Sequence, residues 1–132
     1  MTSNMDVPTQ SLTAGERMAS DALQISYQRD SIALLAELLA DAEGLRPLTW
    51  TVADAGAHLT GWCMGEPESR RLDVFGAWRA FLLTRADCRP DLEQNLRLPD
   101  GETRLAAEWQ HYRGSTVRVT LAARIPPDPG DE

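Results

Sequence analysis

The chain has 132 residues, a formal net charge of −7 and a hydrophobic fraction of 42%, which is too high for a disordered protein. This length predicts a single domain. No apolar run reaches the roughly 20 residues of a membrane-spanning helix, and residues 1–11 are polar, unlike a secretory signal. We therefore expect a soluble cytoplasmic protein with no membrane contact, and not a disulfide-rich secreted one.

The acidic charge is concentrated at the two ends of the chain. Residues 1–43 contain seven acidic side chains and two arginines, and residues 126–132 contain three acidic side chains and no base. Residues 44–125 are close to neutral, with eleven arginines and ten acidic side chains, and the chain has no lysine. The acidic, proline-containing residues 126–132 predict a disordered tail. A role in steering a partner or mimicking DNA is the alternative.

The N-terminal third predicts a flexible arm followed by a long helix. Residues 1–12 have no periodicity. Thr13 and Glu16 fit a capping box, and Gly44 fits a helix C-cap, so we expect a helix over 14–43. Its apolar side chains are Met18, Ala22, Ile25, Ile32, Leu34, Leu35, Leu38 and Leu39. The first half is thinly amphipathic, which leaves open a break near residues 26–30 or docking on another chain.

Two strands are expected next, because apolar and polar residues alternate over 48–52 and 58–64. Gly61 is expected to weaken the second strand and to mark a bulge. Trp62 and Met64 fall on the opposite face of that strand from Cys63. That face therefore needs a covering layer, either the N-terminal helix or another protein.

Residues 70–83 predict the central helix of the fold. Val74, Phe75, Trp78, Phe81 and Leu82 recur at three- and four-residue steps along one face. Ser69 is placed to cap the amino end. We expect this helix to cover the apolar face of the sheet, with Phe75 in the core.

The last third predicts two more strands and an optional edge strand. Alternation over 103–112 and 116–125 places Trp109 and Val119 in the core. Residues 93–98 favour a short edge strand, with a turn of helix as the alternative. The fold class is therefore α+β: an N-terminal helix followed by ββαββ and the extra edge strand. We expect the sheet to be antiparallel because the hairpin turns are short.

The sequence contains no recognisable catalytic, metal-binding or cofactor-binding motif. Cys63 and Cys88 lie 25 residues apart without a CxxC pattern, which favours free thiols. His58 and His111 lie in predicted strands close to carboxylates. Either could act as a general base if it lined a pocket, although a structural histidine is the simpler interpretation. We predict no catalytic residues, no metal and no cofactor.

Arg104, Arg118 and Arg124 are expected to point away from the core, with Thr116 and Thr120 among them. Such a face can bind an anion or an acidic partner. An ordinary solvated sheet face, which Glu108 would share, is the alternative.

We also expect the chain to form a homodimer, because its apolar helix exceeds what a small sheet can cover. The interface residues that this predicts are Met18, Ile25, Trp62 and Met64.

The segments PLTWTVADAGAHLTGWC, DVFGAWRAFL and TVRVTLAARI resemble small actinobacterial proteins of Streptomyces type, and of their plasmids and phages, that have no assigned function. The resemblance covers about residues 34–125. It implies a cytoplasmic actinobacterial protein, with a mobile element as one source, and transfers no site residues. The function that we expect is a non-catalytic protein-binding or adaptor module. A nucleic-acid accessory protein and a small enzyme or ligand-binding fold are the alternatives, and generic DNA binding is not expected.

Overall fold

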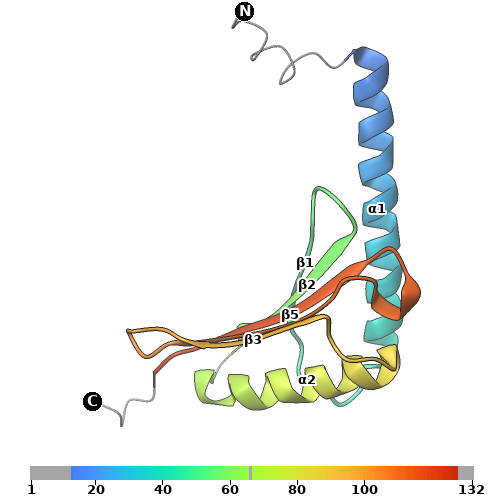
Figure 1. The fold of residues 1–132 in the computed structure, drawn as a ribbon. Helices are drawn as coiled ribbons and strands as arrows, with labels where there is room; N and C mark the ends of the chain where they lie inside the picture. The colour runs from blue at the N-terminus through green and yellow to red at the C-terminus, as the bar shows by residue number, and fades with distance from the viewer. Residues whose placement is uncertain (1–12, 66, 128–132) are drawn as a thin grey trace, which may run out of the picture.

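A five-stranded sheet is the frame of the molecule, with α2 packed across one of its faces and α1 rising past one side (Figure 1). The computed structural model describes residues 13–65 and 67–127, so the arm predicted over 1–12 and most of the predicted tail lie outside the described residues. The elements in chain order are α1 Ala14–Asp41, β1 Thr49–Val52, β2 His58–Cys63, α2 Arg71–Ala86, β3 Leu92–Arg97, β4 Thr103–Trp109 and β5 Arg118–Ile125.

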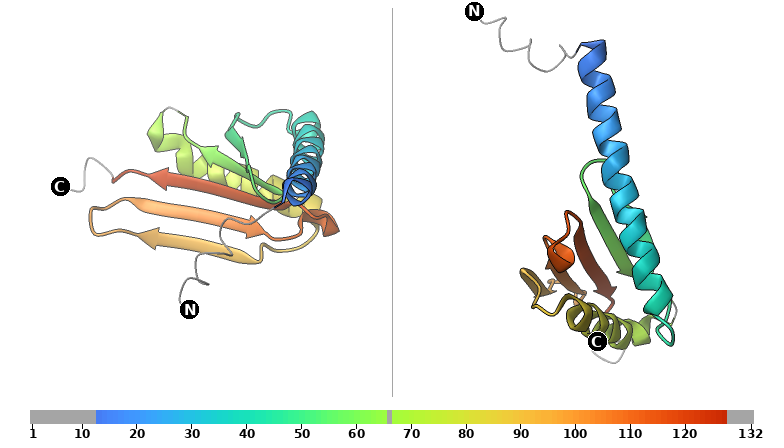
Figure 2. Two further views of the ribbon diagram at one scale, coloured as in Figure 1. Left: turned by 90° about the horizontal axis from the view of Figure 1, so that it is seen from above. Right: turned by 90° about the vertical axis from the view of Figure 1, so that its right-hand side faces the viewer.

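α1 is one continuous helix, without a break near residues 26–30. The predicted capping box is present: the Glu16 amide donates to Thr13 Oγ1 at 3.0 Å, and the Thr13 amide donates to Glu16 Oε1 at 2.9 Å. The second half of α1 joins the core through Leu34 and Leu38. Every residue from 14 to 23 is exposed, because the first half of the helix projects beyond the sheet (Figure 2). Among the described residues, no helix has the length and apolarity needed to cross a membrane.

The sheet is mixed, so the prediction of an antiparallel sheet is wrong at one pair. The strand order is β1-β2-β5-β4-β3, and β2 pairs with β5 in parallel. α2 carries the chain back to the end where β2 starts, so β3 runs in the same direction as β2. Two hairpins later β5 runs in that direction again and takes the place beside β2. The short turns make only the other three pairs antiparallel.

The edge strand predicted over 93–98 is present as β3, which pairs with β4. β4 is shorter than the predicted strand 103–112 because the chain leaves the sheet after Trp109. Tyr112 instead turns inward, in a 3-10 turn, and its hydroxyl donates to the carbonyl of Leu82 at 2.8 Å. His111 is exposed beside this turn and does not share the face of Trp109.

The core lies between the sheet and α2. Phe75, Trp78 and Leu82 of α2 pack against a set of buried strand residues that includes Leu59, Trp109, Val119 and Leu121. The predicted Ser69 cap is wrong. Ser69 lies in a 3-10 turn, and the N-cap residue is Arg70, whose side chain makes no capping bond.

Gly61 does not mark a bulge. It pairs in regular register with Trp50 of β1. A Cβ at this position would lie 2.9 Å from Cη2 of the Trp50 indole. The glycine is therefore needed because the indole lies directly against the backbone of β2.

Candidate functional site: the open face of the sheet

Within residues 13–65 and 67–127, no helix lies over one face of the sheet. The strand register places on it a set of side chains that point away from α2, which we call the open face: Thr49, Thr51, His58, Thr60, Trp62, Leu92, Gln94, Leu96, Arg104, Ala106, Glu108, Arg118, Thr120, Ala122 and Arg124. Met64 continues it just beyond β2 and is 55% exposed. α1 does not cover it, in contrast to one of the two expectations for Trp62, because α1 joins the same core as α2.

A shallow hollow of about 520 Å³ lies in the open face. Its floor is Ala106 and Ala122, which are direct partners on β4 and β5. Trp62 is the partner of Ala122 on one side, and Gln94 is the partner of Ala106 on the other. The hollow exists because two small side chains lie between two larger ones in a row across four strands.

Two arginines border one end of the hollow. Arg104 and Arg124 are direct partners across β4 and β5, and both are exposed. Glu102 accepts from Nε of Arg104 at 3.0 Å and from Nη2 of Arg124 at 3.0 Å. These hydrogen bonds lower the pKa of the Glu102 carboxyl. One carboxylate thus holds two guanidinium groups side by side and neutralises one of their two charges. Each guanidinium has five N–H donors, so both retain donors for a ligand.

Arg118 is not part of this pair. It lies on the same face of β5 as Arg124 but six residues away, about 20 Å along an extended strand. Thr116 precedes β5 and donates to Asp30 of α1 at 3.4 Å. Of the predicted Arg/Thr surface, the structure therefore brings together only Arg104 and Arg124.

His58 belongs to a polar chain across the opposite end of the open face. Its Nε2 lies 2.8 Å from Thr120 Oγ1, and the Thr120 hydroxyl donates to Glu108 Oε1 at 3.0 Å. Since that hydroxyl has a single proton, His58 must be the donor to Thr120. Burial, and then the charge of Arg118, lower the pKa of His58, whereas Glu108 opposes them. A neutral imidazole is consistent with this chain.

Neither histidine is among the residues that line the hollow. Nε2 of His58 is engaged by Thr120. His111 lies in the exposed turn after β4. The arrangement around His58 ties three strands together.

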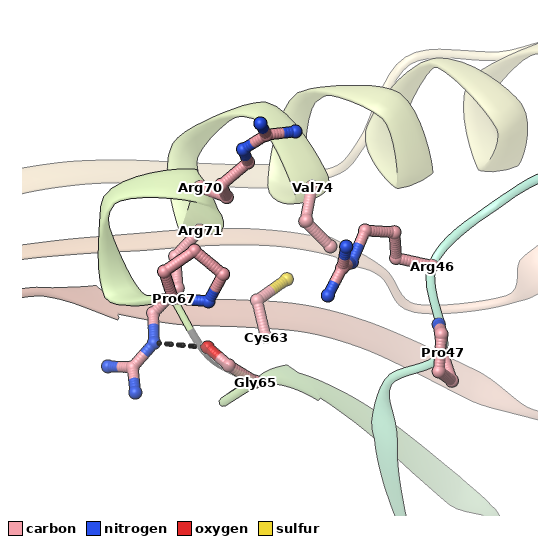
Figure 3. Close-up of a pocket in the computed structure, with 8 residues that line it drawn as sticks. All are labelled: Arg46, Pro47, Cys63, Gly65, Pro67, Arg70, Arg71 and Val74. Atoms are coloured by element: carbon pink, nitrogen blue, oxygen red, sulfur yellow. Dashed lines mark hydrogen bonds between the residues drawn. The ribbon is translucent and has the colours of Figure 1, made fainter.

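A second, smaller pocket of about 90 Å³ lies between the end of β2 and the start of α2 (Figure 3). Arg46, Arg70 and Arg71 surround it, with Cys63 at its base. Arg71 donates to the carbonyls of Met64, Gly65 and Arg124. Its guanidinium therefore links the segment that follows β2 to the end of β5. Burial raises the pKa of the Cys63 thiol to about 11, which keeps it protonated and unreactive. We interpret this pocket as structural.

The remaining predicted residues fall elsewhere. Met18 and Ile25 lie on α1, whereas Trp62 and Met64 lie on the open face, so the four belong to two separate surfaces. Cys88 is an exposed free thiol in the loop after α2. In residues 13–65 and 67–127, no group of three or more His, Cys, Asp or Glu side chains is placed to hold a metal ion.

The sequence did not reveal the floor of the hollow or the role of Glu102. Alternation alone assigns Ala106 and Ala122 to the outward face, but it does not place them next to each other. Glu102 precedes β4 in the hairpin loop, where no periodicity applies. No protein-family model, curated protein or solved structure matches the chain.

Proposed function

We propose that this protein is a non-catalytic binding module that takes a protein partner on the open face of its sheet. The observation that carries the proposal is the hollow with the indole of Trp62 on one side and the Arg104–Arg124 pair at one end. Tryptophan and arginine are the residue types that most often dominate binding energy at protein interfaces. Here they flank a floor of alanines that leaves room for a side chain from the partner.

The partner that fits is a peptide segment with an apolar side chain next to a carboxylate. The apolar side chain would enter the hollow over Ala106 and Ala122. The carboxylate would reach the two guanidinium groups, which can bind it through paired N–H donors. Glu102 holds these groups side by side but leaves one net positive charge at the site.

The same residue types also suit single-stranded nucleic acid, which binds by base stacking on aromatic rings and phosphate contacts to arginine. The charge distribution favours the protein partner. Glu102 and Glu108 lie among the arginines of this surface, and the chain has a net charge of −7. We therefore expect no measurable binding to generic duplex DNA at physiological salt.

The test is selection of binders from a random peptide library displayed on phage, with the full chain as bait. We expect the enriched peptides to combine a large apolar residue with an adjacent Asp or Glu. Trp62→Ala should lose them, and so should Arg124→Ala. Arg118→Ala is the matched control, because it removes an exposed arginine from the same face of the same strand without touching the hollow. It should bind the peptides as the unchanged protein does.

Two results would overturn the proposal. One is peptide binding that survives both Trp62→Ala and Arg124→Ala. The other is tight, salt-sensitive binding of a fluorescent oligonucleotide that disappears in the double variant Arg118→Ala, Arg124→Ala, which would favour the nucleic-acid function. Both arginines are exposed, so circular dichroism of this double variant should show an intact fold.

A further inference from the structure

The outer face of α1 carries four large apolar side chains at intervals of seven residues. Met18, Ile25, Ile32 and Leu39 are 71%, 50%, 55% and 51% exposed. We call these four the outer row. A seven-residue apolar period is typical of helices that pack lengthwise against another helix, because 3.5 residues per turn keep the row facing its partner.

The outer row lies on a different side of α1 from the core. At about 100° per residue, its centre is turned by roughly 140° from the centre of the buried set Ser31, Leu34 and Leu38. On one side the row is bordered by mostly small residues, namely Ala19, Ala22, Ser26, Ala33, Ala36 and Ala40, with Arg29 as the charged residue on that side. Asp21, Gln28 and Leu35 border the other side. The face is thus a row of large side chains with alanines along one side, which allows close approach of a second helix.

We propose that the outer face of α1 binds the same face of a second copy of this chain, in an antiparallel two-helix pair. The spacing argues for a helical partner with a matching row, and α1 itself provides one. In the antiparallel arrangement Ala22 lies level with the partner's Leu39, and Ile25 lies level with the partner's Ala36. The four outer layers then combine one large and one small side chain, whereas the two central layers pair Arg29 with Ile32. The alternation of large and small side chains lets the two rows interdigitate.

The position of Arg29 also favours the antiparallel pair. In a parallel, in-register pair, Arg29 would face the same arginine of its partner, and Ala22 would face alanine across a gap. In the antiparallel pair, Arg29 lies level with the partner's Ile32, and the two arginines are separated by three residues, about 4.5 Å, along the axis. The antiparallel arrangement therefore avoids placing two like charges directly opposite each other.

The pair also accounts for the first half of α1. Residues 14–23 are exposed on all sides within one chain, and an isolated stretch of this length is only marginally helical in water. The antiparallel pair lays this half along the second half of the partner's α1.

The first experiment is the molar mass of the full chain by multi-angle light scattering at micromolar concentration. We expect the mass of a dimer for the unchanged protein. The double variant Ile25→Glu, Ile32→Glu should have half that mass and unchanged helical circular dichroism, because both side chains are exposed in the single chain. Leu23→Glu is the matched control: Leu23 is 49% exposed on the same helix but lies off the outer row. It should remain a dimer.

The second experiment measures the orientation. A spin label at Ser20→Cys, in a Cys88→Ser background, should give an inter-label separation of about 30 Å along the axis in the antiparallel pair. A parallel pair would bring the labels level with each other. A monomeric unchanged protein, a double variant that still dimerises, a Leu23→Glu variant that dissociates equally, or level labels would each overturn the proposal.

Discussion

Trp50 and Trp78 meet edge to face in the core, with ring centroids 5.7 Å apart and ring planes inclined by 74°. Their indole N–H groups differ. Nε1 of Trp78 donates to the carbonyl of Arg46 at 2.6 Å, whereas Nε1 of Trp50 is buried without an acceptor among the described residues. A buried donor without a partner costs stability, and a satisfied one contributes to it.

Replacement of each tryptophan by phenylalanine should therefore have unequal effects. Trp78→Phe removes a hydrogen bond and leaves the Arg46 carbonyl without its partner, whereas Trp50→Phe removes an unsatisfied donor. We expect the free energy of unfolding to fall by about 1–3 kcal/mol more for Trp78→Phe than for Trp50→Phe. Urea unfolding followed by circular dichroism measures the difference. Equal losses at an unchanged urea dependence would contradict this account of the pair.

The two cysteines should react very differently with thiol reagents. Burial raises the pKa of Cys63 to about 11, so about one molecule in a thousand would carry its thiolate at pH 8. Cys88 is exposed. Iodoacetamide at pH 8 should modify Cys88 alone in the folded protein and both cysteines in urea, as measured by mass spectrometry. The Cys88→Ser variant is the control and should stay unmodified until it unfolds; rapid reaction of folded Cys63 would refute the prediction.

The protein should lose stability in acid through three carboxylates. Hydrogen bonds lower the pKa of Glu16, Glu93 and Glu102 below the ordinary value of 4.5, with Thr13, Arg79 and Arg104 as the first partners. A group with a lowered folded pKa stabilises the fold above its unfolded pKa, and this contribution is lost as the pH falls through the folded value. From these carboxylates we expect the melting temperature to decline below about pH 4.5. His58, whose folded pKa is also lowered, adds a decline that begins as the pH falls below its ordinary value of 6.5.

Glu102→Gln isolates one of these contributions. Its melting temperature should lie below that of the unchanged protein at pH 7, because Arg104 and Arg124 then repel each other, and the two proteins should converge in acid. High salt should reduce the difference at pH 7, since exposed charges are screened. Glu37→Gln on the exposed side of α1 serves as the control. A difference that persists in acid would show that Glu102 acts by something other than its charge.

Local pattern in the sequence determined the elements and their faces. Thr13 and Glu16 predicted the start of α1 because a capping box involves residues only three positions apart. Alternation placed Trp109 and Val119 inside and Arg104 and Arg124 outside, since successive side chains of a strand point to opposite faces. Each of these inferences depends on a period of a few residues, which the sequence displays directly.

Neighbours across the sheet were decided by the tertiary structure. The parallel pairing of β2 with β5 joins residues about 60 positions apart, such as Trp62 and Ala122, and no local period encodes it. The hollow, the adjacency of Arg104 and Arg124 and the position of Glu102 all depend on that register or on the β4–β5 register. Backbone hydrogen bonds between segments distant in the sequence fix these relationships, and α2, which carries the chain to β3, packs against the resulting sheet. The site therefore forms only when the sheet is complete.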